Sequence, residues 1–187
     1  MSSSGYPTAD YFSFSVLVLR QFDGSRPARI RVRLENSGPE PFHYEYGPVM
    51  PFTRHHEHRD WGDVRAVVVP ESDTDSLLPD VEVAADANPA GTPHETVDPE
   101  REEVPMGLGA DVYPGDQIEQ TYEVYAYPDD DATLPDGSYR FEGDHPVHRG
   151  TAINHGYGGT LSLAFTLDVD GGVLTAESAD EAVEASE

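Results

Sequence analysis

Apolar and polar residues alternate along several short stretches of the chain. In residues 28–35, Ile30, Val32 and Leu34 alternate with arginines and a glutamate. A period of two places the apolar side chains on one face of a β-strand. Similar alternation, or a short apolar run, predicts further strands at 12–19, 42–46, 64–69, 81–84, 118–127, 138–142, 160–168 and 172–176.

These strands are separated by turn residues at intervals of about ten residues, and helix signals are nearly absent. The expected fold class is all-β, an immunoglobulin-like antiparallel β-sandwich of about 8–9 strands with long loops. We expect a flexible N-terminus at 1–10 and a single domain at 11–176, interrupted by an irregular insertion at 88–115. Residues 177–187 are acidic and rich in alanine, which predicts a frayed tail.

One segment, Pro135-Asp136-Gly137-Ser138-Tyr139, carries a specific structural signal. The Pro-Asp-Gly turn leads into a strand whose second residue is a tyrosine. In β-sandwiches this spacing makes a tyrosine corner, in which the phenol hydrogen-bonds a backbone group a few residues upstream. We therefore expect structural roles for Gly137 and Tyr139.

Two other motifs accompany this corner. A strand ends in Leu34-Glu35-Asn36-Ser37, and Tyr113-Pro114-Gly115-Asp116 opens a later strand. Together with the corner they resemble the intracellular proteinase inhibitor (BsuPI-type) family of immunoglobulin-like domains, over roughly residues 12–142. The chain has Pro-Asp-Gly where that family usually has Pro-Gly, and it carries the insertion at 88–115. The resemblance implies an immunoglobulin-like sandwich and an inhibitor that binds a proteinase.

The chain has 36 acidic residues against 11 basic ones, and its formal net charge is -25. Carboxylates are spread over the whole length, and every basic residue is an arginine. At about 10 mM salt the screening length is ~30 Å, so these charges repel one another, whereas at about 1 M it falls to ~3 Å. The composition predicts the protein of an extreme halophile.

The same charge disfavours nucleic acid as a partner, because phosphate binding needs clustered basic residues. The one basic cluster contains Arg26, Arg29, Arg31 and Arg33. The last three alternate with apolar residues, which is typical of the solvent face of a strand. Weak attraction of an anion to this face is the alternative.

Two missing residue types exclude whole classes of chemistry. Without cysteine there are no disulfides, thiolate nucleophiles, thiolate zinc sites or iron–sulfur clusters. Without lysine there is no Walker-type phosphate loop and no Schiff base. No apolar run approaches the ~20 residues of a membrane-spanning helix. Because residues 1–10 also lack a signal-peptide pattern, we expect a cytoplasmic protein without membrane contact.

Histidines gather in two expected loops, 48–62 and 143–159. The first holds His55, His56 and His58, and the second holds His145, His148 and His155. Imidazoles bind zinc, copper and nickel, so a divalent metal is the one cofactor left open, with His43 or Asp60 completing the site. The alternative is that these histidines are solvated and lack the surrounding contacts that fix metal ligands.

No motif supports catalysis, so we assign no catalytic residue. The predicted function is a non-enzymatic module that recognises another protein through the two loops, with Phe52, Trp61 and Tyr157 as interaction residues. The aromatic residues Phe42, Tyr44 and Tyr46 suit either such a surface or the core. Two alternatives remain: a metal-binding protein using the histidine loops, and a structural or assembly subunit whose edge strands pair with neighbours.

Overall fold

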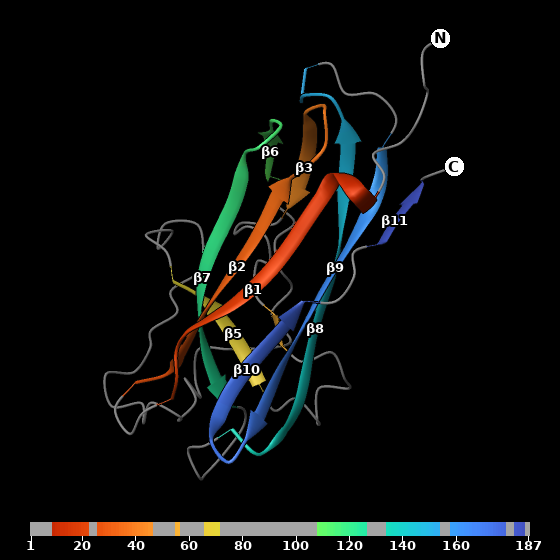
Figure 1. Ribbon diagram of the computed structural model, residues 1–187. Coiled ribbons are helices and arrows are strands. Elements are labelled where there is room, and N and C mark those ends of the chain that lie inside the picture. The colour runs from red at the N-terminus through yellow and green to blue at the C-terminus, as the bar shows by residue number, and fades with distance from the viewer. Residues whose placement is uncertain are drawn as a thin grey trace.

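Two antiparallel β-sheets pack face to face, which agrees with the predicted all-β sandwich (Figure 1). A computed structural model of the protein describes residues 9–22, 26–46, 55–56, 66–71, 108–126, 134–153, 158–178 and 182–185. The expected antiparallel β-sandwich is confirmed. In these described residues no helix is long and apolar enough to cross a membrane.

The first sheet, sheet A, has five strands in the order β1-β2-β7-β5-β4. A short 3-10 helix, η1 (Ala9–Tyr11), precedes it. Its strands are β1 (Phe12–Arg20), β2 (Ala28–Asn36), β4 (His55–His56), β5 (Ala66–Pro70) and β7 (Gln117–Ala126).

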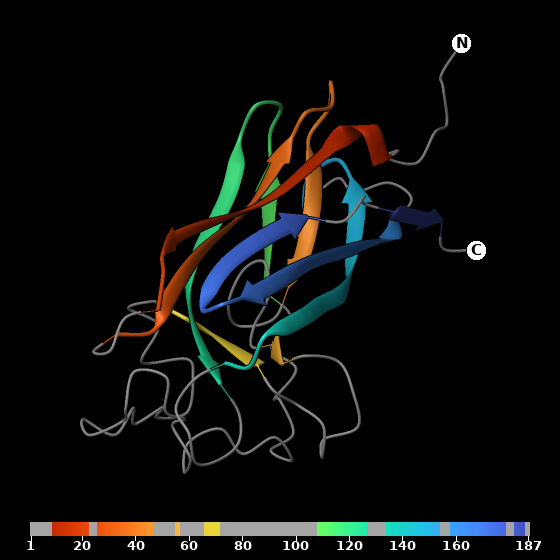
Figure 2. The same ribbon diagram turned by 60° about the horizontal axis from the view of Figure 1, so that its bottom comes forward.

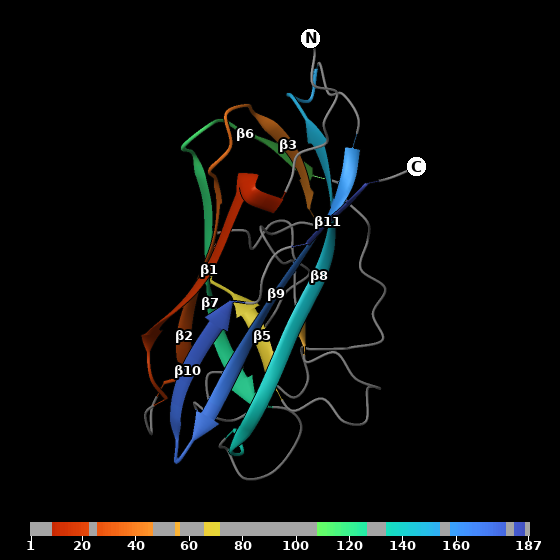
Figure 3. The same cartoon turned by 45° about the vertical axis from the view of Figure 1, so that its right-hand side comes forward.

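The second sheet, sheet C, has the order β10-β9-β8-β3-β6, and a further strand, β11, also pairs with β9 (Figure 3). Its strands are β3 (Phe42–Tyr46), β6 (Leu108–Val112), β8 (Gly137–Arg149), β9 (Gly158–Asp170), β10 (Val173–Ser178) and β11 (Ala182–Ala185).

The order of the strands matches the constant-type immunoglobulin arrangement. In that arrangement strands A, B, E and D form one sheet and C, F and G the other. Here β1, β2, β7 and β5 occupy the first set, and β3, β8 and β9 the second. The additional strands lie at sheet edges, so the central immunoglobulin-like topology is kept.

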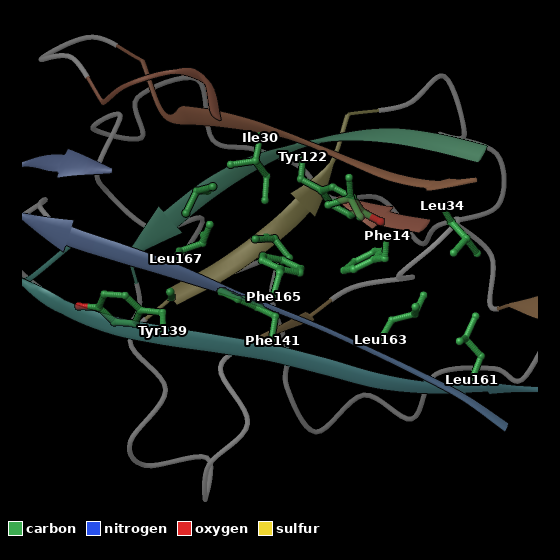
Figure 4. Packing of buried hydrophobic residues seen from close by; sticks show 14 of the residues in the cluster. Phe14, Ile30, Leu34, Tyr122, Tyr139, Phe141, Leu161, Leu163, Phe165 and Leu167 are labelled. Carbon is green, nitrogen blue, oxygen red and sulfur yellow. The ribbon is translucent and has the colours of Figure 1, made fainter. Parts of the chain in front are cut away.

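The core lies between the two sheets and follows the predicted alternation. In β2 the inward side chains Ile30, Val32 and Leu34 are fully buried. Phe141 and Phe165 stack with ring centroids 4.9 Å apart within sheet C (Figure 4). Phe12 of sheet A meets Phe42 of sheet C edge to face at 4.6 Å. Each buried side chain of this size contributes roughly 1.5–3 kcal/mol, and the Phe12–Phe42 contact joins the two layers directly.

Three elements differ from the sequence-based expectation. The loop predicted at 143–159 begins only after Arg149, because β8 continues to that residue and pairs with β9 over Gly137–His148. The insertion at 88–115 contains β6, which pairs with β3. The predicted frayed tail contains β11, whose pairing with β9 orders residues 182–185. The predicted strand at 81–84 lies outside the described residues.

Candidate functional site

Three described turns meet at one end of the sandwich, which we call the loop end and define as residues 37–41, 113–116 and 150–153 (Figure 1). The first turn joins β2 to β3, the second joins β6 to β7, and the third follows β8. The antiparallel order places them together, because β2, β6 and β8 all run toward this end.

Asn36, the last residue of β2, links two of these turns from a fully buried position. Its side-chain amide donates to the carbonyl oxygens of Glu40 (2.9 Å) and Val112 (2.8 Å). Its side-chain oxygen accepts from the Gly38 N–H at 2.9 Å, and its backbone carbonyl accepts from the Gly115 N–H at 2.8 Å. One amide therefore fixes the first turn and ties it to the second.

Asp111 of β6 links the second turn to the third. One carboxylate oxygen, Oδ1, accepts from the Ala152 N–H and contacts His43 Nδ1, both at 2.8 Å. The Ala152 N–H, and then His43, hold the pKa of Asp111 below its usual range. Because an ionised carboxylate only accepts hydrogen bonds, Nδ1 of His43 carries the proton. This contact holds the third turn against the sheet.

Arg149, at the end of β8, ties the third turn to the first. Its guanidinium makes a two-point contact with the Glu40 carboxylate, in which Nη2 lies 2.5 Å from Oε1. Hydrogen bonding from Arg149 lowers the pKa of Glu40, and the same contact raises the pKa of Arg149. Next to it, the Gly150 N–H donates to the Pro41 carbonyl at 2.8 Å. All three turns are thus joined by hydrogen bonds.

Two large apolar side chains are exposed on the loop end. Ile153 is 90% exposed and Tyr113 is 52% exposed. They flank the Asp111–Ala152 hydrogen bond, since Tyr113 follows Asp111 by two residues and Ile153 follows Ala152 directly. The loop end therefore presents apolar surface on a backbone that is held in place.

A pair of histidines lies on the outer face of sheet C beside the loop end. His43 and His148 are opposite each other on β3 and β8, with ring centroids 6.4 Å apart. His148 Nε2 lies 3.1 Å from a carboxylate oxygen of Glu45. Glycines make room for the rings, because a Cβ at Gly109 or Gly158 would come within 2.5 or 2.4 Å of His43 or His148.

The predicted metal site is not assembled by the described residues. His145 and His148 lie on opposite faces of β8: His145 is 8% exposed and packs on Tyr44, whereas His148 faces outward. These two histidines do not converge on one point, because alternate faces of a strand separate them. The described residues contain no group of three or more His, Asp or Glu that could hold a metal ion.

The first histidine cluster belongs to the other sheet. His55 and His56 form β4, opposite Val68 and Val67 of β5 in sheet A. His58, His155 and Asp60 lie outside the described residues, as do the three predicted interaction residues Phe52, Trp61 and Tyr157. From the sequence, His43 was expected only to complete a metal site with that cluster.

The two predicted structural residues are in place. Tyr139 donates from its phenol to the Pro135 carbonyl at 2.5 Å, which is the expected tyrosine corner, and Gly137 begins β8. Tyr139 stands near the start of the strand equivalent to F, where immunoglobulin domains carry this tyrosine. Phe42 and Tyr44, candidates for either a surface or the core, are buried in the core.

The arginines of β2 face solvent, as predicted, and they contact carboxylates. Arg29 pairs with Glu71, and Arg33 lies 3.2 Å from Glu119, which Arg31 also approaches at 3.9 Å. These contacts offset the positive charge that would attract an external anion.

Comparison of the chain with protein-family models, with curated proteins and with solved structures finds no match.

Proposed function

We propose that this chain is a non-enzymatic immunoglobulin-like module that recognises another protein through its loop end. The observation that carries the proposal is the 90% exposure of Ile153 in a turn that Asp111, Arg149 and Pro41 hold in place. Burial of one such side chain at an interface is worth roughly 1.5–3 kcal/mol.

Preorganisation supports the same function. A binding loop that is already ordered loses less conformational entropy when a partner docks, so more of the contact energy appears as affinity. At the loop end the backbone groups of Gly38, Gly115, Gly150 and Ala152 are hydrogen-bonded within the protein. Binding residues are often placed on such loops by a rigid scaffold.

The proposed recognition surface is smaller than the one predicted from sequence. Residues 150–153 are the described part of the second predicted loop, whereas residues 143–149 belong to β8. The resemblance to intracellular proteinase inhibitors agrees with a protein partner, and we extend the proposal to a salt-rich cytoplasm on the strength of composition. A proteinase is then the first class of partner to test.

The experiment compares substitutions of exposed apolar residues at the two ends of the sandwich. Ile153→Asp and Tyr113→Ser alter the loop end, whereas Val173→Asp adds the same charge at an exposed position of β10 (55% exposed), near the opposite end of β9. Tagged protein is used to recover partners from lysate in molar salt. We expect wild type and V173D to retain the same protein, and the two loop-end variants to lose it.

Equal recovery by I153D and V173D would refute a role for the loop end. Failure of the wild type to retain any protein would refute the binding function itself.

A further inference from the structure

β1 forms one edge of sheet A and is built differently from the other edges. It is nine residues long and, among the described residues, pairs with β2 alone. Its outward side chains are Ser13, Ser15, Leu17 and Leu19, and Leu17 is 58% exposed and Leu19 39% exposed. The edge is therefore long and partly apolar, and its pairing with β2 is regular from Phe12 to Val18, before a register shift between Val18 and Arg20. Figure 2 shows the course of β1 beside β2.

Edges of this kind are usually protected, because their unpaired backbone groups can pair with another chain. The other edge strands of more than three residues carry charge: β6 has Asp111, β10 has Glu177 and β11 has Glu184. On β10 the side chain of Gln21 also occupies both backbone groups of Leu174. β1 has no carboxylate between Phe12 and Arg20 and no proline.

The distribution of charge determines which kind of chain can pair with this edge. Two copies of a chain with a net charge of -25 repel each other over most of their surfaces. At β1 the contacting strand has no carboxylate, and on the next strand, β2, the outward arginines pair with Glu71 and Glu119 of the same chain. Two copies that meet along β1 avoid direct opposition of carboxylates, which would destabilise paired strands.

The regular part of β1 sets the register of a self-pairing. It runs from Phe12 to Val18, before a register shift, and Arg20 beyond it pairs with Glu123 of its own chain. An antiparallel self-pairing of this stretch is centred on Ser15, which then lies next to the two-fold axis. Such a contact is isologous, because the same patch serves on both copies.

We propose that β1 pairs antiparallel with β1 of a second copy of this chain, which joins the two A sheets into one continuous sheet across a two-fold axis. Backbone hydrogen bonds supply the pairing, and Leu17 and Leu19 supply apolar contact. Dimerisation becomes more favourable as the salt concentration rises. Screening weakens the charge repulsion between the two acidic chains more than it weakens the contact along β1.

The first test measures mass in solution by sedimentation velocity from low to molar salt. Leu17→Asp places a carboxylate on each copy beside the axis, and Val173→Asp is the matched control at a similarly exposed position. We expect wild type, V173D and I153D to dimerise at high salt and L17D to stay monomeric. A wild type that is monomeric at every salt concentration, or equal association of L17D and V173D, would overturn the proposal.

The second test does not depend on the folding of L17D. The chain contains no cysteine, so Ser15→Cys introduces a single thiol next to the proposed axis. Mild oxidation in molar salt is expected to give a disulfide-linked dimer, because the two Cα atoms must approach to about 4.4–6.8 Å for the bond to form. Val173→Cys is the control, and equal cross-linking of both variants would contradict the pairing of β1.

Discussion

The side chain of Gln21 bonds both backbone groups of Leu174. Its Nε2 donates to the Leu174 carbonyl at 2.8 Å, and its Oε1 accepts from the Leu174 N–H at 2.7 Å. Gln21 follows β1 in sheet A and Leu174 lies in β10 of sheet C. One amide thus takes the place of a neighbouring strand and closes the sandwich where the two edges meet.

This contact predicts a stability effect. Gln21→Ala leaves the N–H and C=O of a residue that is 1% exposed without these partners, and each such loss costs about 1–3 kcal/mol. Gln21→Glu should also destabilise, because a carboxylate cannot donate to the carbonyl. Denaturant unfolding measures the change, and hydrogen exchange of the Leu174 amide should quicken. Gln117→Ala, at an exposed position of β7, is the control, and equal stability of the two alanine variants would contradict this role.

Burial of His145 predicts a loss of stability in acid. Desolvation lowers the pKa of His145 from 6.5 to about 4, although Asp144 opposes the shift. Between these values the unfolded chain binds a proton that the folded chain does not. The contribution of His145 to the free energy of unfolding is therefore fully present above about pH 6.5. It is lost as the pH drops toward 4, and the loss is about 3 kcal/mol.

The measurement for His145 is a difference between two proteins, because many carboxylates titrate in the same range. Unfolding free energies of wild type and His145→Leu are compared from pH 7 to 4 at constant high salt. We expect wild type to lose more stability than the variant over this range. Parallel pH profiles would show that His145 does not carry the effect.

Asn36 is predicted to be the most sensitive polar residue of the loop end. Asn36→Asp keeps an acceptor for the Gly38 N–H but removes the donor to the carbonyls of Glu40 and Val112. Loss of this buried donor, and burial of a charge, should cost at least about 2 kcal/mol. Calorimetry checks this against Ser37→Ala at the adjacent exposed position, and similar melting temperatures would contradict the role of Asn36.

Salt should stabilise the fold through screening. Thirty-six acidic residues face 11 basic ones, so repulsion acts over ~30 Å at about 10 mM salt and over ~3 Å at about 1 M. We expect the free energy of unfolding to rise with the concentration of KCl, and to rise less with sucrose at matched osmolarity. A fold that is equally stable in 10 mM and molar KCl would contradict the predicted adaptation.

The sandwich could be predicted because its signals are local. Alternation in β2 specifies which side chains are buried, and the spacing from Pro135 to Tyr139 specifies the tyrosine corner. The length of β8 was missed because Gly143 and Pro146 are typical of a loop. Pairing with β9 overrides them. The pairing of β8 with β3 covers Val147 to Arg149 and stops at Pro146, which has no N–H to donate.

The loop end could not be predicted because its contacts are long-range. Asp111 lies 68 residues from His43 and 41 from Ala152, in a stretch without any apolar period. The glycines at 109 and 158 were the available signal, since a glycine within a strand often marks the close approach of another group. Both in fact accommodate an imidazole ring.

The most direct test of the binding function places a photo-activated cross-linking residue at position 153 of the intact chain, with the exposed position 173 as the control. Both proteins are irradiated in lysate at molar salt, and the cross-linked products are identified by mass spectrometry. We predict that position 153 captures one protein that position 173 does not. The same products from both positions, or none from position 153, would contradict recognition through the loop end.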